Sequence, residues 1–362
     1  MKFLLFGAGE AASQLIEGVK GLSINIIGVL DNDKSKQGNE FYGQAILYPG
    51  QLFTLDYDYI CILVKRFQDV YNQLVYGYHI DAAKVVDRYF LLKHIMMEKY
   101  QDDDDEDIQE TISYWKNNKE LTFLNQFGFA DAVYEEVFWD VESNMPYVIY
   151  KNRRMYYPRT YRDFIVRNGS MYAVTYREIE QHERSPHRYL TDQICIKEND
   201  IVVDAGAREG DFTLPYIDMI KKLYLFESDP DWVKALEMTY RNYKDKVVII
   251  PKMLSDTVNE DSTTLSEVIR EEQIDFIKMD IEGAEVKALS ASQDLLKNND
   301  IKFAVCCYHR KGDREKIEHI LSANGYQCSV SNGCVVFIAD PCILKDADFR
   351  KGVVYAIKGR DK

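Results

Sequence analysis

The sequence predicts an α/β protein made of two doubly wound Rossmann-like domains, the C-terminal one with an antiparallel edge to its sheet. Short apolar runs alternate with helically spaced apolar residues in residues 1–90 and again from Asp200 onward. This alternation is typical of parallel sheets covered by helices. A glycine-rich turn follows the first strand of each stretch, and the length of 362 residues also suits two domains.

The first stretch supplies a nucleotide or nucleotide-sugar binding domain, expected over residues 1–100. Its predicted strands are Lys2–Phe6, Ile24–Leu30, Tyr59–Val64 and Val85–Val86. Helical spacing between them predicts helices at Ala11–Lys20 and Phe67–Tyr76.

A helical linker and a substrate-side segment are expected over residues 101–190. The acidic block 102–107 is either a solvated boundary or the frayed start of a helix over 108–127. The candidate buried positions of that helix are Ile108, Ile112, Trp115, Leu121 and Leu124.

Residues 134–189 are rich in tyrosine and contain a local reversal of charge. The reversal is a 17-residue basic stretch, residues 151–167, in which Asp163 is the one acid. Its basic residues are Lys151, Arg153, Arg154, Arg159, Arg162 and Arg167. They form either a solvated surface with tyrosines packed at its base or the lip of a pocket for a phosphorylated or otherwise anionic substrate.

The C-terminal domain is expected over residues 191–362. Its predicted parallel strands are Ile201–Asp204, Leu223–Phe226, Val247–Ile250, Phe276–Ile281 and Phe303–Tyr308. Helices are expected at about 211–221, 231–243, 264–272, 284–297 and 313–324. Ser331-Asn332-Gly333 is a hairpin turn signal between Tyr326–Val330 and Cys334–Ala339, and Val353–Ile357 is expected to be a last strand.

Composition and charge exclude several classes of protein. Apolar residues make up 46% of the chain, which excludes wholesale disorder. No apolar run is long enough for a membrane span, and the start lacks a signal-peptide pattern. Seven scattered cysteines without C-x-x-C predict reduced thiols, a cytoplasmic location and no zinc site. The net charge of −14 argues against nucleic acid as a partner, whereas a small-molecule or carbohydrate substrate is expected and a homo-oligomer stays open.

The N-terminal turn, Phe6-Gly7-Ala8-Gly9-Glu10-Ala11-Ala12, fits the pattern G-x-G-x-x-A. Gly7 permits the tight turn, and Gly9 lets a pyrophosphate approach the backbone at the helix start. Asp31 ends the next strand, where an acid accepts a hydrogen bond from a ribose hydroxyl. These residues predict a site for a nucleotide, a nucleotide sugar or NAD. The alternative is that the glycines only permit close packing of strand and helix.

This segment resembles the N-terminal Rossmann-like domain of sugar-modifying bacterial proteins, including sugar-nucleotide dehydratases and sugar acyltransferases. The matching pieces are Phe6-Gly7-Ala8-Gly9, Gly28-Val29-Leu30-Asp31-Asn32-Asp33 and Tyr42-Gly43-Gln44-Ala45-Ile46. The resemblance implies a nucleotide or nucleotide-sugar site without saying which ligand.

The C-terminal turn is Val202-Val203-Asp204-Ala205-Gly206-Ala207-Arg208-Glu209-Gly210, a strand that runs into D-x-G-x-x-x-G. Glu227 ends the next strand, where an acid holds both hydroxyls of a ribose. Because the turn lacks G-x-G, it favours S-adenosylmethionine over a dinucleotide. The alternative is a packing turn followed by a surface glutamate.

A third motif, Phe276-Ile277-Lys278-Met279-Asp280-Ile281-Glu282-Gly283-Ala284-Glu285, places acids at the carboxyl end of an apolar strand. Open α/β sheets bind ligands at this edge. The alternative is charge that complements a helix dipole, which suits Glu285 better than Asp280.

Together, Asp204–Thr213, Phe226–Pro230 and Lys278–Glu285 resemble the FkbM-type S-adenosylmethionine-dependent methyltransferases. Further matching pieces are Ser185-Pro186-His187-Arg188-Tyr189, Ala304–His309 with Asp313, and Val354-Tyr355-Ala356. Arg208-Glu209 departs from the pattern, because family members often carry Asn and a small residue there. The resemblance covers about residues 190–362 and implies a class I methyltransferase sheet, S-adenosyl-L-methionine as cofactor, and O-methylation of sugars or other natural products.

These motifs and the resemblance supply a set of candidate site residues. Those expected to bind the cofactor are Asp204, Gly206, Ala207, Gly210, Glu227, Ser255, Asp256, Asp280 and Glu282, and those expected to contact the substrate are Arg159, His187 and Arg188. No metal site is predicted from spacing.

The predicted base is His309, which closes the strand beside Asp280 in the expected strand order. Methyl transfer is an in-line displacement in which the cofactor supplies the leaving group, so the protein orients the hydroxyl and helps remove its proton. Asp280 is either the group that orients His309 or the base itself. The alternative for His309 is a structural histidine at a strand end.

The predicted function is therefore S-adenosylmethionine-dependent O-methylation of a sugar of a polysaccharide or of its nucleotide-linked precursor. A nicotinamide-dependent sugar-nucleotide oxidoreductase would use the N-terminal turn instead, but no Tyr-x-x-x-Lys pair follows that turn at a suitable spacing. A non-catalytic scaffold that senses the cofactor or a nucleotide sugar stays open, because Asp204, Glu227 and Asp280 argue only for binding.

Overall fold

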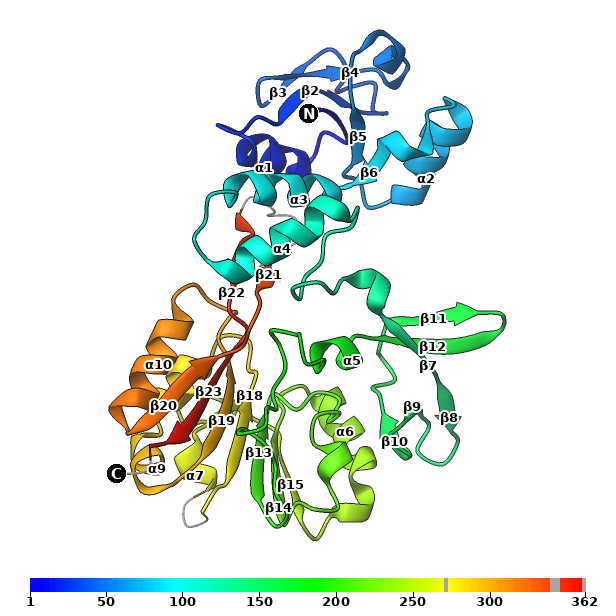
Figure 1. The fold of residues 1–362 in the computed structure, drawn as a ribbon. Helices are drawn as coiled ribbons and strands as arrows, with labels where there is room; N and C mark the ends of the chain where they lie inside the picture. The colour runs from blue at the N-terminus through cyan, green and yellow to red at the C-terminus, as the bar shows by residue number, and fades with distance from the viewer. Residues whose placement is uncertain (270–272, 339–345, 360–362) are drawn as a thin grey trace. The chain divides into compact units, whose positions relative to one another are not determined.

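The computed structural model describes residues 1–269, 273–338 and 346–359 (Figure 1). The chain forms two compact units: unit 1 is residues 1–128 with 336–349, and unit 2 is residues 129–335 with 350–362. This division differs from the expected segments 1–100, 101–190 and 191–362. Within the described ranges, no helix combines the length and the apolar character that a bilayer span requires.

Unit 1 is built on a sheet in the order β3-β4-β2-β1-β5-β6. Its strands are β1 (Lys2–Phe6), β2 (Asn25–Leu30), β3 (Glu40–Phe41), β4 (Gln44–Leu47), β5 (Tyr59–Ile62) and β6 (Val85–Asp87). All pairings are parallel except β3 with β4. The sequence predicted β1, β2, β5 and β6, but not the short β3 and β4.

Helices pack on both faces of this sheet. Leu15 of α1 (Glu10–Gly18) and Leu91 of α3 (Arg88–Lys99) share a core with Phe3 and Leu5, whereas Val70 of α2 (Phe67–Asn72) packs with the opposite-facing Leu4. A single π-helical segment, η2 (Gln73–Gly77), continues α2 over the rest of its predicted range.

The acidic block begins a helix, α4 (Glu106–Asn117), because the Asp105 carboxylate accepts a hydrogen bond from the Asp107 backbone. This helix ends well short of the predicted residue 127. The buried Lys93 ammonium donates to the carbonyl oxygens of Trp115, Asn118 and Lys119, which caps the helix there.

Residues 336–349 belong to unit 1, although they follow almost the whole of unit 2 in sequence. The Val336 backbone donates to the Phe123 carbonyl oxygen, and the Phe349 ring stacks on Trp115 with ring centroids 5.4 Å apart. These residues lie on β21 (Val335–Phe337) and β22 (Asp348–Arg350).

The tyrosine-rich segment of unit 2 forms two small antiparallel sheets. One has the order β10-β9-β8, from β8 (Phe138–Asp140), β9 (Met145–Tyr150) and β10 (Arg153–Tyr156). The other has the order β11-β12-β7, from β7 (Val133–Glu136), β11 (Phe164–Arg167) and β12 (Ser170–Thr175). The four-residue α5 (Arg177–Glu180) follows β12.

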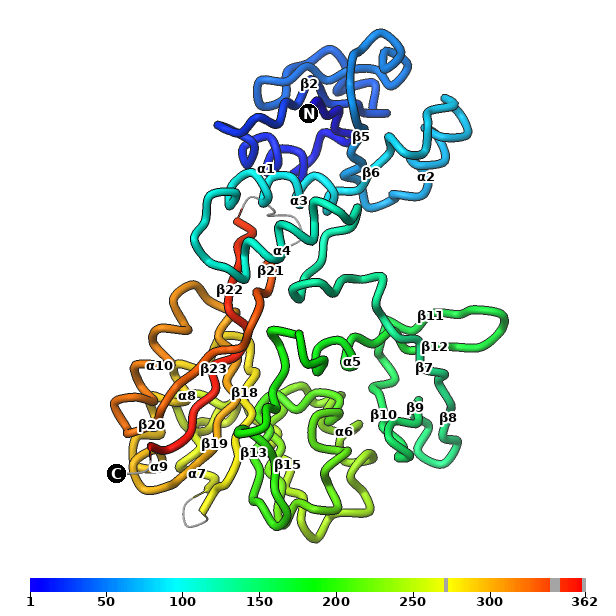
Figure 2. Tube along the Cα trace, in the orientation of Figure 1, coloured from blue at the N-terminus to red at the C-terminus, as the bar shows by residue number. Residues whose placement is uncertain are grey.

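The main sheet of unit 2 has the order β15-β14-β13-β18-β19-β23-β20. All of these strands except β14 are labelled in Figure 2. Its strands are β13 (Ile201–Ala205), β14 (Lys222–Phe226), β15 (Val247–Ile250), β18 (Phe276–Met279), β19 (Lys302–Cys306), β20 (Tyr326–Val330) and β23 (Val353–Lys358). The first five in this order are parallel, as predicted, and the antiparallel strand β23 lies between β19 and β20.

The predicted hairpin at Ser331-Asn332-Gly333 is therefore wrong. The antiparallel partner of β20 is β23, and the Ser331 backbone donates to the Val353 carbonyl oxygen where the two strands meet. Residues 336–349 depart into unit 1 between these strands, so the turn signal marks an exit from the sheet.

Helices cover both faces of the main sheet. Leu236 of α6 (Pro230–Thr239) packs on one face, and Leu265 of α7 (Leu265–Val268), Leu289 of α8 (Glu285–Ser290), Leu296 of α9 (Gln293–Asn298) and Ile317 of α10 (Asp313–Ala323) pack on the other. The predicted helix over 211–221 forms only a 3-10 turn, η5 (Leu214–Tyr216). The loops after β13, β14 and β18 consequently gather at one edge of a sheet that is buried on both faces.

Candidate active site

A cavity of about 1180 Å³ opens at the carboxyl ends of β13, β14 and β18. The sheet contributes Gly206, Ala207, Glu227, Asp280 and Glu282 to its wall, and the tyrosine-rich segment contributes the side that holds Tyr157 and Tyr161. Its size exceeds that of a typical pocket for one drug-sized ligand, so a cofactor and part of an acceptor fit together.

The glycine turn after β13 is compact for a steric reason. Gly206 has φ +77°, and a Cβ there would lie 1.8 Å from the Asp280 carbonyl oxygen. Gly210 has φ +74° and packs against Leu236 and Tyr240 instead of lining the cavity. Gly206 and Ala207 are thus the turn residues that face the predicted ligand position. Gly210 allows the turn to pack closely against Leu236 and Tyr240.

Asp204 is buried beneath the turn. Its Oδ1 lies 3.0 Å from the Lys278 Nζ, which also donates to the Gly206 carbonyl oxygen, and neither side chain is more than 5% exposed. Burial raises the pKa of Asp204, although the Lys278 ammonium opposes that shift. Asp204, expected to bind the cofactor, is placed by the structure in an ion pair that joins the ends of β13 and β18.

Glu227 lines the cavity at the end of β14. One of its carboxylate oxygens accepts from the Arg208 backbone and the other from the Asp229 backbone. These bonds fix the carboxylate, and each oxygen retains a second lone pair for a ribose hydroxyl.

Ser255 and Asp256, both predicted to bind the cofactor, are not among the residues that line this cavity. The Ser255 hydroxyl donates to the Asp256 carboxylate, and the Ser255 backbone pairs with Thr263. The wall beside them is made by Met253 and Leu254, an apolar surface that the sequence motifs did not single out.

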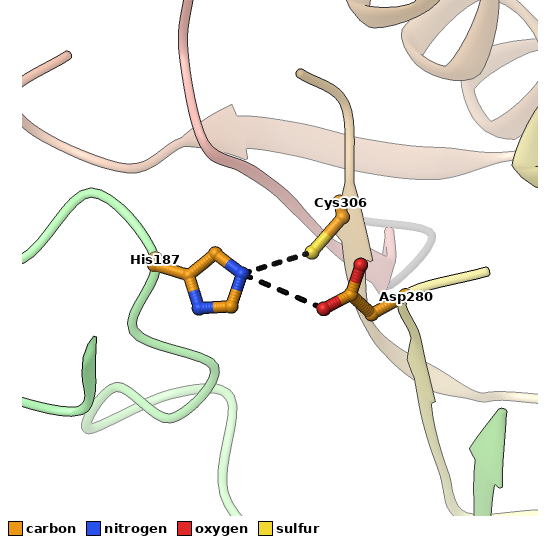
Figure 3. Close-up of side chains that lie close together, drawn as sticks. All are labelled: His187, Asp280 and Cys306. Carbon is orange, nitrogen blue, oxygen red and sulfur yellow. Dashed lines mark hydrogen bonds and ion pairs between the residues drawn. The ribbon is translucent and has the colours of Figure 1, made fainter. Parts of the chain in front are cut away.

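Asp280 is the centre of the polar wall (Figure 3). Its Oδ2 accepts from the Tyr189 hydroxyl at 2.8 Å and lies 3.5 Å from the His187 Nε2. That nitrogen is also 3.8 Å from the Cys306 Sγ and 3.1 Å from the Tyr308 hydroxyl. Burial opposes the ionised form, but the neighbouring His187, Lys278 and His309 outweigh it and lower the pKa of Asp280.

His309, the predicted base, lies behind Asp280 and is not among the residues that line the cavity. Its Nε2 is 3.3 Å from the Asp280 Oδ1, and its Nδ1 is 3.0 Å from the Glu285 Oε1. The strands that lead to the two residues, β18 and β19, are adjacent, but β19 ends at Cys306, before His309 is reached. The ring faces inward, with only 7% of its side chain exposed. The histidine on the cavity side is His187, which sequence reasoning placed among substrate contacts.

The candidate substrate residues separate into two groups. His187 and Arg188 line the cavity, whereas Arg159 is exposed and does not line it. Of the basic segment, Lys151 and Arg162 reach the wall. The other four basic side chains of the segment contact protein residues instead of the cavity. Arg153 pairs with Asp218, Arg154 stacks on Tyr147, Arg159 interacts with Asp231, and Arg167 stacks on Tyr134.

Two charged cavity residues, Glu209 and Arg177, were not predicted as site residues. Burial raises the pKa of Glu209 to about 7, against the opposing charge of Arg208. Arg177 is buried and donates to the Glu135 carboxylate and the Tyr157 hydroxyl. The departure at Arg208-Glu209 from the family pattern was the available signal for Glu209, whereas nothing in the sequence marks Arg177.

The N-terminal turn in unit 1 is held by its own residues. Gly7 has φ +111°, and a Cβ there would lie 2.6 Å from the Val64 Cγ1; at Gly9 a Cβ would meet nothing within 4 Å. The Asp31 carboxylate accepts from the backbones of Ala8 and Asp33 and lies 3.2 Å from the Lys36 Nζ. Close packing therefore accounts for Gly7, and polar contacts within the turn account for Asp31. A nucleotide, nucleotide sugar or NAD at this turn stays a prediction.

Comparison with known proteins gives different families for the two parts of the chain. Residues 197–328 match the family described as the methyltransferase FkbM domain. Unit 2 carries a methyltransferase domain. Its strand order, with β23 antiparallel between β19 and β20, is the class I methyltransferase arrangement that the resemblance implied.

Residues 1–86, which precede the methyltransferase domain, match a different family, described as C2185-like, N-terminal. This match does not confirm the expected resemblance to sugar-nucleotide-modifying enzymes. A search among curated proteins finds no match to the chain.

Solved structures similar to this methyltransferase chain are distant. A methyltransferase FkbM from Methylobacillus flagellatus KT has 15% identity and a TM-score of 0.43, covering 98% of this chain and 89% of its own. A precorrin-6y C5,15-methyltransferase from Geobacter metallireducens GS-15 has 13% identity and a TM-score of 0.32, covering 46% and 85%. A magnesium protoporphyrin IX methyltransferase from Synechocystis PCC 6803, solved with bound SAM, has 13% identity and a TM-score of 0.31, covering 45% and 71%.

Proposed function

We propose that unit 2 binds S-adenosylmethionine at the carboxyl ends of β13, β14 and β18 and methylates a hydroxyl of a sugar or polysaccharide precursor. One observation carries this proposal: a single cavity joins the Gly206 turn and Glu227 to the Asp280 cluster. The acid proposed to bind the ribose and the group proposed to accept the proton therefore face the same cavity.

The residues present fit the cofactor. The close approach at Gly206 keeps side-chain atoms away from the turn, and Glu227 offers the fixed carboxylate that a ribose requires. Met253 and Leu254 supply an apolar surface for a planar base. When bound, the cofactor supplies an electrophilic methyl group and its own leaving group.

The opposite wall suits a polyhydroxylated acceptor. Tyr157, Tyr161, Phe164 and Trp232 form one aromatic cluster with ring centroids 4.9–5.8 Å apart. Flat rings combined with hydroxyl groups match the apolar faces and hydroxyls of a carbohydrate. Arg188 adds a positive charge on the cavity wall, where a phosphate-linked sugar would find a partner.

We assign His187 as the base that accepts the proton of the acceptor hydroxyl. It lines the cavity, and Asp280 lies 3.5 Å from its Nε2, where a carboxylate stabilises the imidazolium that forms. Tyr189 and Tyr308 restrict the ring from two further sides. His309 supports Asp280 from the side away from the cavity.

The cofactor assignment is tested by calorimetry with Glu227→Gln, which removes the charge while keeping an acceptor oxygen. We expect S-adenosylmethionine affinity to fall by about 10–150-fold, the equivalent of about 1.5–3 kcal/mol for hydrogen bonds to a charged group. Glu237→Gln, an exposed acid on α6, is the matched control. Unchanged affinity in a folded Glu227→Gln protein contradicts the assignment.

The acceptor assignment is tested with methyl-labelled cofactor and a panel of nucleotide sugars and oligosaccharides. We expect an alkali-stable methyl ether on a sugar hydroxyl, and His187→Gln should lower its rate of formation by about 10²–10⁴-fold with cofactor affinity retained. Transfer to nitrogen or carbon acceptors alone contradicts hydroxyl specificity. Near-normal turnover by folded His187→Gln removes that residue as the base.

A further inference from the structure

One imidazole, that of His309, lies among three carboxylates. Its Nε2 is 3.3 Å from the Asp280 Oδ1 and 3.6 Å from the Glu282 Oε2, and its Nδ1 is 3.0 Å from the Glu285 Oε1. Donor atoms of Asp280, Glu285 and His309 all lie within 4.8 Å of one another. Even a fully protonated His309 leaves this group with a net negative charge.

The cluster is also short of hydrogen bonds. The Glu285 side chain is fully buried, yet its Oε2 has no hydrogen-bond partner among the described residues. The Glu285 Oε1 is occupied by the Ile281 backbone. Burying a carboxylate oxygen without a partner is costly, and a positive charge close to the cluster would reduce that cost.

The distances match donors that share one ion. Two ligands bound at about 2.1 Å and separated by 90–110° lie about 3.0–3.4 Å apart. The Nε2–Oδ1 separation falls in this range, and the exposed Glu282 side chain can close the slightly longer gap. Glu285 on the opposite ring nitrogen supplies the carboxylate that orients a metal-bound histidine.

We propose that His309 Nε2, Asp280 and Glu282 hold a divalent cation, with Glu285 as the residue that positions the imidazole. Carboxylate oxygens with one imidazole favour an ion of the Mn²⁺ type. The backbone is shaped for this arrangement, because Glu282 and Gly283 both have positive φ and turn the chain between β18 and α8.

The site borders the cavity, because Asp280 and Glu282 both line it, although the His309 ring itself lies on the far side of Asp280. In a role that rests on the proposed function, the ion binds the acceptor hydroxyl oxygen and lowers the pKa of that hydroxyl. Binding of the ion itself does not depend on that function.

A second arrangement around Asp280 competes for the ion. His187, Asp280 and Cys306 also present donor atoms within 4.8 Å of one another (Figure 3). Its histidine nitrogen, however, already lies within hydrogen-bonding distance of the Tyr308 and Tyr189 hydroxyls. The His309 side of Asp280 has no such hydroxyl contact among the described residues and is therefore the site we assign.

The test is a Mn²⁺ titration of the chelator-treated full chain, followed by electron paramagnetic resonance. We expect one saturable site, weakened at least tenfold in His309→Gln and about 10–100-fold in Glu285→Gln. Asp256→Asn, outside the cluster, and Cys306→Ser, in the competing cluster, should bind as the wild type does. Absence of saturable binding, equal binding by His309→Gln, or loss of binding in Cys306→Ser each overturns the proposal.

Melting temperatures separate a metal site from a purely structural ion-pair cluster. Mn²⁺ should raise the melting temperature of the wild type and of Cys306→Ser but not that of His309→Gln, whereas an ion-pair cluster gives no Mn²⁺ response in any of them. S-adenosylmethionine binding is measured in parallel, so that failure of the metal site can be distinguished from failure of the proposed function. Cofactor binding without Mn²⁺ binding overturns only the metal site, and Mn²⁺ binding without cofactor binding overturns only the proposed function.

Discussion

The pKa values of two acids in the cavity, Asp280 and Glu209, shift in opposite directions because their neighbours differ. Asp280 faces two imidazoles and Lys278, and its pKa is lowered despite burial. Glu209 is half-buried, with 18% of its side chain exposed, but Arg208 does not compensate for the lost hydration, and the pKa of Glu209 rises to about 7. Such divergence between carboxyl groups is common where one site needs both a permanent charge and a neutral group.

Glu209 should make the stability of unit 2 fall as the pH rises. Its pKa is about 7 in the folded chain against 4.5 for an unperturbed glutamate, so between these values the native state holds a proton that the unfolded state has released. Unfolding free energy therefore decreases across this window. Glu209→Gln should be more stable than wild type at pH 8.5, by on the order of 2 kcal/mol, and the gain should shrink toward pH 4.5.

Thermal unfolding followed by circular dichroism at pH 5 and pH 8.5 measures this effect. Glu237→Gln, an exposed acid, is the control and should leave the pH profile unchanged. A Glu209→Gln gain that is equal at both pH values would show that burial of the charge is not its cause.

Residue types and motif spacing predicted which residues gather at the sheet edge, but not which way each one faces. Gly206, Glu227, Asp280 and His187 line the cavity, whereas Asp204 turns into an ion pair and His309 turns inward. A polar residue after an apolar strand satisfies the same sequence pattern in either orientation. Its orientation depends on partners such as Lys278 and Glu285, which come from other elements.

At the scale of elements, the site depends on how closely β13 approaches β18. Gly206→Ala places a methyl group against the Asp280 carbonyl oxygen at a position with positive φ. We expect a loss of about 2–4 kcal/mol of stability together with loss of cofactor affinity, because strand separation is added to backbone strain. Gly169→Ala is the matched control: its φ is +83°, but a Cβ there meets nothing within 4 Å, so only strain should appear.

Urea unfolding and cofactor calorimetry on both variants decide this prediction. Equal losses in the two would mean that positive φ alone explains the need for glycine at Gly206.

The buried Lys278–Asp204 pair joins the same two strands from below. Lys278→Met leaves the Asp204 carboxylate unpaired in the interior and should cost about 3–5 kcal/mol. Adding Asp204→Asn should recover much of that loss, because the stranded charge is removed. Chemical denaturation of the single and double variants measures the coupling, and a double variant no more stable than Lys278→Met would contradict this account.

Most elements could be predicted from local apolar spacing, and the failures have identifiable causes. The five parallel strands of unit 2 and the strands β1, β2, β5 and β6 of unit 1 follow from that spacing. The partner of β20 did not, because the turn signal after it is local and its true partner, β23, lies beyond an excursion into unit 1. The end of α4 depends on Lys93, a residue from another helix.

At the scale of the whole molecule, the two units have separate cores, so a ligand of one should leave the melting of the other unchanged. S-adenosylmethionine at 100 times its Kd should stabilise unit 2 by about 2.7 kcal/mol. Calorimetry should then show one transition that moves with the cofactor and one that does not. Trp115→Phe, in the unit 1 core, should lower only the unmoved transition; a cofactor shift in both would show that the units unfold together.

The excursion of residues 336–349 has a consequence for the order of synthesis. A ribosome delivers Val336 and Phe349, which complete the unit 1 core, only after residues 129–335 have emerged. β23 follows them, so β19 and β20 are both made before the strand that pairs with each. Unit 1 can therefore complete its core only after most of unit 2 has been made, and unit 2 can complete its sheet only after β23 follows. Nascent chains stalled before this segment should therefore expose the open edge of β19 and the unfilled side of the unit 1 core to chaperones and proteases together.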